Sequence, residues 1–272
     1  ASDVYKRQAE PQFLRVTEGG EPRQIACLVQ EGVGPATIWL GGFRSDMRAT
    51  KAEALAGWAA AAGRRFVRFD YSGHGESGGD FADGCISAWL ADALAVIAAH
   101  GGPRPVLVGS SMGGWLALLA ARALAASGHA PGSGHKPGAL VLIAPAVDFT
   151  RDLMWAQMPQ AAREAVMNDG HWMRPSAYSP EPYPITRRLI EDGDRHRLFG
   201  APIEPGCPVT ILQGMQDPDV PWTQAMKLME HLPADDVTMT LVKDGDHRLS
   251  RPQDIALLIR TVETICAAAQ AT

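Results

Sequence analysis

Long apolar runs, cysteine motifs and an excess of basic charge are all scarce in this sequence. The apolar run at residues 138–147 is too short to cross a bilayer as a helix, so we expect no membrane span. Lys and Arg number 25 against 30 Asp and Glu, which leaves a net charge of -5. Because nucleic-acid-binding proteins usually present a basic face, this balance disfavours a nucleic-acid partner.

The 4 cysteines lie far apart and form no CxxC pair, which argues against a zinc site or a thioredoxin-like motif. An even count permits disulfides, but we expect free thiols in a reducing cytosol and therefore a cytoplasmic protein. Residues 1–10 are not followed by the apolar h-region of a signal peptide, and their apolar residues do not recur with the spacing of a helix or a strand. We expect a disordered tail there, and this N-terminus does not support a mitochondrial address.

The dominant pattern along the 272 residues is a short apolar strand followed by an amphipathic helix. A leading antiparallel hairpin is expected at 13–17 and 24–29, around Gly19 and Gly20. Strands are expected at 37–40, 65–69, 105–108, 139–144, 208–212 and 237–242. Helices are expected at 86–100, 112–126 and 252–268, and another begins at a capping box of Thr50 and Glu53 and ends at Gly63. This alternation predicts an α/β protein with a mostly parallel sheet and helices on both faces.

One segment interrupts the pattern between residues 148 and 205. It contains no clear strand, and it is rich in Met, Trp, Tyr and Pro. An insertion of this size is usually a functional lid or a linker, and its aromatic content favours an ordered helical lid. We therefore divide the chain into a core of residues 11–147 and 206–272 and a lid of residues 148–205. A surface loop rich in Gly, Pro and Ser is expected at 128–138.

The motif G-x-S-x-G occurs once in the strand–helix context that it requires, at residues 109–113. A strand must turn so sharply into a helix there that the central residue, Ser111, is strained and its hydroxyl projects outward. Side chains at positions 109 and 113 would collide, which explains the two glycines. Ser110 is the other hydroxyl, but its spacing to the glycines is wrong for a nucleophile. Ser111 is therefore the predicted nucleophile.

A serine hydroxyl needs a base, and in this type of fold the acid precedes the histidine along the chain. Asp217 follows the apolar run at 208–212, and His247 follows the last predicted strand. Both then lie at carboxyl ends of strands, where open α/β sheets place their sites. Asp219 could orient the histidine instead of Asp217, and Asp244 and Asp246 are alternatives that could simply form turns.

The other histidines are assigned elsewhere. His74 lies in a Gly-rich turn and is expected to be structural. His100 and His231 are expected to end helices. His129 and His135 fall in the polar loop, and His171 and His196 fall in the lid.

Two backbone amides are expected to stabilise the developing oxyanion. The N–H of Met112 lies at a helix N-terminus, directly after the nucleophile. The second donor should come from the loop at 41–46, where glycines precede Phe43 and allow the backbone to approach a substrate oxygen. We therefore assign the N–H of Phe43, although an ordinary glycine turn would look the same in sequence.

From about Phe13 onward the chain resembles the α/β-hydrolase family. Within this family it is similar to the branch that contains the mitochondrial palmitoyl-protein thioesterase, also a mycophenolic acid acyl-glucuronide esterase, and its bacterial relatives. The similar stretches are residues 68–73, 108–115, 172–178, 214–217, 220–222 and 246–248. The resemblance implies Ser111, Asp217 and His247 as the triad, so it favours Asp217 over Asp219. The composition, rich in Ala and Arg, is typical of a bacterial protein.

These features predict a serine hydrolase that cleaves a small-molecule ester or thioester through an acyl-enzyme and needs no metal or organic cofactor. Because a fold does not fix its chemistry, a C–C hydrolase, a lyase or a perhydrolase is an alternative. A catalytically silent ligand-binding module is another, whereas a dehalogenase would require Asp at position 111. The sequence leaves the acyl group, the leaving group and the oligomeric state open.

Overall fold

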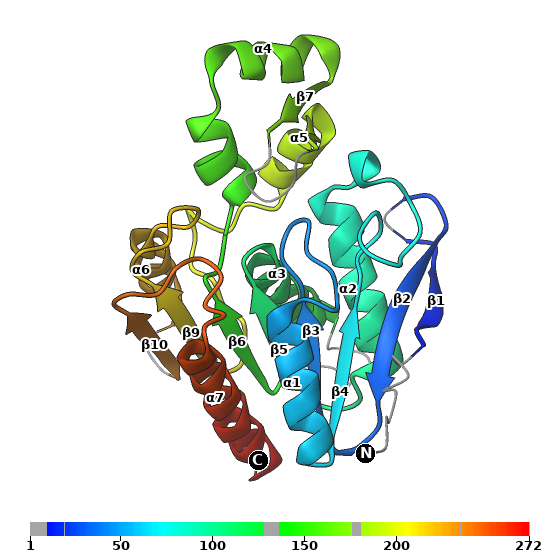
Figure 1. The fold of residues 1–272 in the computed structure, drawn as a ribbon, viewed down its shortest axis with the longest axis vertical. Helices are drawn as coiled ribbons and strands as arrows, with labels where there is room; N and C mark the ends of the chain where they lie inside the picture. Colours follow the sequence, from blue (N-terminus) through cyan, green and yellow to red (C-terminus); the bar gives the residue numbers. More distant parts are fainter. Residues whose placement is uncertain (1–9, 19, 128–135, 176–180, 234–235, 272) are drawn as a thin grey trace, which may run out of the picture.

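The computed structural model describes residues 10–18, 20–127, 136–175, 181–233 and 236–271. The expected tail before residue 10, most of the loop at 128–138 with His129 and His135, and the end of the motif at 172–178 lie outside these ranges. Eight strands form one sheet in the order β1-β2-β4-β3-β5-β6-β9-β10 (Figure 1). They are β1 (Gln12–Val16), β2 (Arg23–Gln30), β3 (Val33–Leu40), β4 (Arg64–Phe69), β5 (Val106–Ser110), β6 (Ala139–Ile143), β9 (Val209–Gly214) and β10 (Val237–Val242).

The sheet is mostly parallel, as the alternation of strands and helices predicts. From β4 to β10 every neighbouring pair runs parallel, whereas β1 pairs with β2, and β2 with β4, in antiparallel fashion. The expected leading hairpin is therefore confirmed. Parallel strands end at the same edge of a sheet, so the loops that follow β3, β5, β9 and β10 all meet there.

Helices cover both faces of the sheet. The helices of the core are α1 (Thr50–Ala61), α2 (Ile86–His100), α3 (Met112–Ser127), α6 (Trp222–His231) and α7 (Pro252–Ala271), with a short 3-10 helix η1 (Phe81–Asp83) before α2. Helices α1 and α7 lie together on one face, and α2 and α3 lie together on the other (Figure 1). Successive side chains of β5 point to opposite faces of the sheet. Val106 and Val108 pack with α1 and α7, and Leu107 packs with α2 and α3. A strand buried on both sides must be apolar throughout, which explains the continuous apolar runs.

The start of α1 differs from the sequence prediction, and the capping box at Thr50 and Glu53 is wrong. The N-cap is Ala49, and no side chain caps the helix. The Glu53 carboxylate instead accepts a hydrogen bond from Nη1 of the largely buried Arg68 at 2.6 Å, so it is not available to cap the first turn. The other end matches the prediction, because Gly63 takes the left-handed conformation (φ +62) that commonly ends a helix.

Residues 148–205, called the insertion below, come between β6 and β9 in the chain, and their described part lies outside the large sheet (Figure 1). The insertion contains the π-helix η2 (Thr150–Trp155), α4 (Gln160–Asp169), β7 (His171–Arg174), β8 (Tyr183–Thr186) and α5 (Arg187–Arg195). Strands β7 and β8 form a small antiparallel sheet, which the sequence did not predict. At its base, the buried carboxylate of Asp148 accepts the N–H groups of Leu198 at 2.9 Å and Phe199 at 3.0 Å. The first residue of the insertion is therefore bonded to the segment that leads back to β9.

Candidate active site

The turn between β5 and α3 takes a single residue, Ser111. Its φ is +55, a left-handed conformation that is costly for any residue with a side chain. The turn is closed by backbone hydrogen bonds to Ser111, since its N–H donates to Ile143 and its carbonyl accepts from Gly114 and Ala146. These bonds hold the strained residue in place, with its side chain only partly buried. The strain and outward projection expected of the central residue are both present.

The two flanking glycines are required by the packing of backbone on backbone. A Cβ on Gly109 would lie 2.3 Å from the carbonyl oxygen of Gly113. A Cβ on Gly113 would lie 2.0 Å from the carbonyl oxygen of Leu40, at the end of β3. Real Cβ atoms essentially never approach other atoms within 3.0 Å, so neither position accepts a side chain without a backbone shift.

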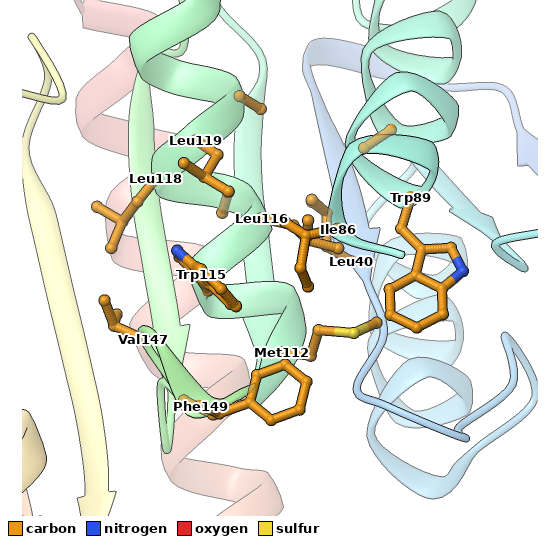
Figure 2. Close-up of a cluster of buried hydrophobic side chains, with 14 of the residues drawn as sticks. Leu40, Ile86, Trp89, Met112, Trp115, Leu116, Leu118, Leu119, Val147 and Phe149 are labelled. Carbon is orange, nitrogen blue, oxygen red and sulfur yellow. The ribbon is translucent and has the colours of Figure 1, made fainter. Parts of the chain in front are cut away.

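Helix α3 starts at Met112, so the N–H of this residue has no partner within the helix and lies at the positive end of the helix dipole. The side chain anchors this amide. Met112 is fully buried, among the side chains of Leu40, Trp89 and Phe149 (Figure 2). The start of the helix is thereby fixed next to Ser111.

Three side chains from three strand ends form a hydrogen-bonded chain. Nε2 of His247 lies 3.1 Å from Oγ of Ser111, and Nδ1 of His247 lies 2.7 Å from Oδ2 of Asp217. A carboxylate only accepts hydrogen bonds, so Nδ1 carries the proton and the lone pair of Nε2 faces the serine hydroxyl. His247 can therefore take a proton from Ser111 while its other nitrogen stays bonded to the carboxylate.

Asp217 is 7% exposed and its carboxylate is held on both oxygens. Oδ1 accepts the N–H groups of Asp219 at 2.9 Å and Val220 at 2.8 Å. Oδ2 lies 3.3 Å from Nε2 of Gln213, a fully buried amide of β9 that also donates to the carbonyl of Val220. Gln213 was not predicted from the sequence, because nothing in a single sequence separates a buried polar residue of a strand from its neighbours.

The rival aspartates occupy different places. Asp219 is exposed, and its backbone N–H supports Asp217. Asp244 forms an ion pair with Arg251 at 2.7 Å, and Asp246 accepts the N–H of Leu249 at 3.0 Å, as turn-forming residues do. Ligand atoms of Asp217, Asp219 and His247 lie within 4.8 Å of one another and could in principle hold a cation. Asp217 and His247 are already bonded to each other, however, so the geometry is that of an oriented base.

Lys51 supports the histidine loop from α1, which is a second contribution that the sequence did not reveal. Its Nζ donates a hydrogen bond to the carbonyl of Arg248, the residue after His247. Burial, together with the charge of Arg248, lowers the pKa of Lys51 to about 8. The loop that carries His247 is therefore tied to the first turn of α1.

The loop after β3 lies against the nucleophile. A Cβ on Gly42 would lie 3.4 Å from the Cβ of Ser111, so the backbone of this loop is within reach of the serine. The ring of the next residue, Phe43, is half-buried and contacts Phe81, Trp89, Phe149 and Tyr183 at centroid distances of 5.1, 5.8, 5.5 and 6.1 Å. Tyr183 belongs to the insertion, so Phe43 lies between the core and the insertion.

Among the histidines that the structure describes, none besides His247 lies within hydrogen-bonding distance of Ser111 or Asp217. His100 and His231 end α2 and α6, as expected. His171 is exposed at the start of β7, whereas Nε2 of His196 lies 2.7 Å from Oγ of Ser87 in α2, so His196 links the insertion to the core. His74 is 5% exposed and contacts the loop that carries Phe43. Within the described residues, no helix combines the length and the apolar character that a bilayer crossing requires.

Comparison with known sequences gives a consistent result. The sequence model of the alpha/beta hydrolase family matches residues 34–256. The chain is 35% identical to the mitochondrial palmitoyl-protein thioesterase ABHD10 of Mus musculus over 236 residues, which are 86% of this chain and 76% of that protein. The same protein of Homo sapiens is also 35% identical over 236 residues, 86% of this chain and 74% of its own length.

Solved structures agree with the sequence relatives. A crystal structure described as that of a hydrolase from Agrobacterium vitis S4 superposes with a TM-score of 0.90 and 48% identity, covering 96% of this chain and 100% of the other. The mouse alpha/beta hydrolase domain-containing protein 10 has a TM-score of 0.81 and 32% identity, covering 96% and 99%. Est1E of Butyrivibrio proteoclasticus, in a structure with bound ferulic acid, shares the fold at 18% identity and a TM-score of 0.73, with coverage of 96% of this chain and 100% of the other.

Proposed function

The chain belongs to the alpha/beta hydrolase family, and from this premise we propose that it is a serine hydrolase that cleaves carboxylic esters or thioesters through an acyl-enzyme on Ser111. The observation that carries the proposal is the hydrogen-bonded chain from Ser111 through His247 to Asp217, with contacts of 3.1 and 2.7 Å. A serine hydroxyl is a weak nucleophile unless a base takes its proton, and this chain provides the base and its orienting acid.

In the first half of the reaction, Oγ of Ser111 attacks the substrate carbonyl carbon while Nε2 of His247 takes the hydroxyl proton. Asp217 stabilises the resulting imidazolium and keeps the ring oriented. The carbonyl oxygen becomes an oxyanion, for which the N–H groups of Met112 and Phe43 are the proposed donors. As the carbonyl re-forms, His247 gives its proton to the departing alcohol or thiol, and the acyl group remains on Ser111.

The second half releases the acyl group. A water molecule loses a proton to Nε2 of His247 and attacks the acyl-enzyme, and the same two amides hold the second oxyanion. His247 then returns the proton to Ser111, and the carboxylic acid leaves. The proton balance closes with these residues, so the mechanism requires no metal or organic cofactor.

The relatives support the choice of substrate class. Those with 35% identity are named palmitoyl-protein thioesterases, so we include thioesters beside oxygen esters. We also propose that the insertion acts as a lid over the acyl group, because Tyr183 of β8 contacts Phe43 beside the nucleophile. The 4 free cysteines fit a protein of a reducing compartment such as the cytosol.

The test combines labelling with matched substrates. A fluorophosphonate should label Ser111, and Ser111→Ala should lower kcat at least ~10⁴-fold on a p-nitrophenyl ester and on the thioester of the same acyl group. Ser110→Ala is the matched control, because Ser110 is the last residue of β5 and its hydroxyl has no role in the proposal. An adduct on Ser110, or near-normal turnover by Ser111→Ala, would refute the assignment.

A further inference from the structure

The loop that carries Phe43 contains a turn that is unusual for its sequence. The N–H of Ser45 donates to the carbonyl of Gly42 at 3.1 Å, which makes residues 42–45 a β-turn with Phe43 and Arg44 at its centre. Arg44 has a φ of +59, whereas Phe43 is not among the residues with positive φ, and this combination at the second and third positions is that of a type II turn. Type II turns normally place glycine there, because a side chain in this conformation is strained.

The central peptide of this turn is held by a buried histidine. The N–H of Arg44 donates to Nε2 of His74 at 3.1 Å. In the alternative type I turn, which a non-glycine residue at the third position favours, the central peptide is turned over and this N–H points away. The bond to His74 therefore selects the type II geometry against the intrinsic preference of Arg44.

His74 is constrained to act as an acceptor. Its Nδ1 lies 3.2 Å from the carbonyl oxygen of Ser72, so Nδ1 carries the proton and Nε2 has a free lone pair. The rings of Tyr71, Phe81 and Trp89 surround the imidazole at 5.3 to 5.8 Å. Burial, with a contribution from the charge of Arg44, lowers the pKa of His74 to about 4, so the acceptor persists at ordinary pH.

We propose that His74 is a positioning residue of the hydrolase: by accepting the N–H of Arg44, it holds the turn at 42–45 so that the N–H of Phe43 faces the oxyanion. The inference rests on the proposed function, since it assigns Phe43 as a donor. Gly42 lies against Ser111 on one side of Phe43, and His74 fixes the peptide on the other side. His74 never touches the substrate, and it acts through the loop.

The experiment compares two side chains of equal length at position 74. His74→Gln keeps an oxygen acceptor, whereas His74→Met has only a weak one. We expect kcat on a p-nitrophenyl ester to fall roughly 10- to 100-fold in His74→Met, with KM within about twofold of wild type, and to fall much less in His74→Gln. A trifluoromethyl ketone, which adds to Ser111 and places an oxyanion in the site, should lose affinity by the same factor as kcat/KM.

A second substitution separates positioning from a general structural role. Glycine at the third position favours the type II turn without help, so Arg44→Gly should restore most of the kcat lost in His74→Met. Arg44→Gly alone measures the effect of removing the Arg44 guanidinium, which lies 4.0 Å from the Tyr183 ring centroid. If His74→Met does not fold, the same rescue is measured on the partial loss in His74→Gln.

Unchanged kcat and ketone affinity in His74→Met, or a loss that Arg44→Gly does not reduce, would overturn the inference. Ser111→Ala is assayed beside these variants. If Ser111→Ala stays active, the proposed function itself is wrong. If Ser111→Ala is inactive while His74→Met is unaffected, the positioning role alone is wrong.

Discussion

Adding one methyl group at Gly113 should damage both the fold and the activity. The new Cβ would lie 2.0 Å from the carbonyl oxygen of Leu40 and 2.6 Å from that of Gly41, whereas an ordinary contact is 3.4–4 Å. Both opposing atoms belong to the backbone, so no side-chain rotation relieves the overlap. The end of β3 or the start of α3 must move by about 1 Å, and overpacking of this kind costs about 3 kcal/mol.

This movement would also change the site, because the loop beyond Gly41 carries Phe43 and the start of α3 carries the N–H of Met112. A misplacement of about 1 Å can cost 10²-fold in rate. We therefore expect Gly113→Ala to lower the melting temperature by about 6–12 °C for a chain of this size and kcat on a p-nitrophenyl ester by ~10²-fold or more.

Gly57 provides the matched control for the same substitution. It is exposed in the interior of α1, and a Cβ there would meet nothing within 4 Å. Gly57→Ala should stabilise the protein by about 0.5–1 kcal/mol, because glycine loses more backbone entropy in a helix than alanine does, and kcat should be unchanged. If Gly113→Ala melts within 2 °C of wild type and keeps its kcat, the steric account of the turn is incorrect.

Three further outcomes are expected. Asp217→Asn should lower kcat ~10³–10⁴-fold by favouring the wrong imidazole tautomer, as the equivalent change does in a serine protease triad. Asp219→Asn should lower kcat much less. The reverse ranking in steady-state kinetics would exclude Asp217 as the orienting acid. The pKa of His74 is about 6.5 in the unfolded chain and about 4 in the folded chain, so the unfolded chain binds the proton more tightly. The free energy of unfolding should therefore be highest above pH 6.5 and fall by about 3 kcal/mol towards pH 4. Urea unfolding at pH 7 and 4.5 measures this loss, which His74→Gln should remove. Finally, kcat/KM should rise roughly threefold to fourfold for each carbon added to the acyl chain of the substrate. If the rings of Trp155 and Trp172 line an acyl pocket, Trp155→Ala and Trp172→Ala should flatten that rise. Equal losses on acetyl and longer esters, with a lower melting temperature, would instead show that these rings hold the insertion together.

The parts of the molecule that depend on local pattern could be predicted from the sequence. The apolar runs of the central strands are continuous because both faces of the sheet are covered, and the turn at Ser111 is fixed by the glycines on either side of it. The capping box failed because the helix begins one residue earlier than predicted, with Ala49 as its N-cap, and the Glu53 side chain pairs with Arg68 of a distant strand.

The contacts that tune the site could not be predicted, because they join residues far apart in the chain. Lys51 reaches Arg248, and His74 reaches Arg44, and no spacing rule connects either pair. Asp217 and Asp219 follow the same strand, so residue-level reasoning left both open. The strands β7 and β8 escaped notice because each has only 4 residues, and Pro184 within β8 is unfavourable in most strand positions.

Asp148, the first residue of the insertion, is bonded to the segment that leads back to the sheet, while Tyr183 and His196 make further contacts of the insertion with the core. The bonds of Asp148 close the insertion into a loop. Loop-closure entropy depends only weakly on length, and doubling or halving such a loop changes its closure free energy by only about 0.6 kcal/mol. We therefore expect that exchanging the segment between relatives leaves the strand ends that hold Ser111 and His247 in place, provided that the contacts of Ser87 and Phe43 with the insertion are kept. A chimaera joined at the two ends of the insertion should keep the chemistry of one parent and take the substrate preference of the other.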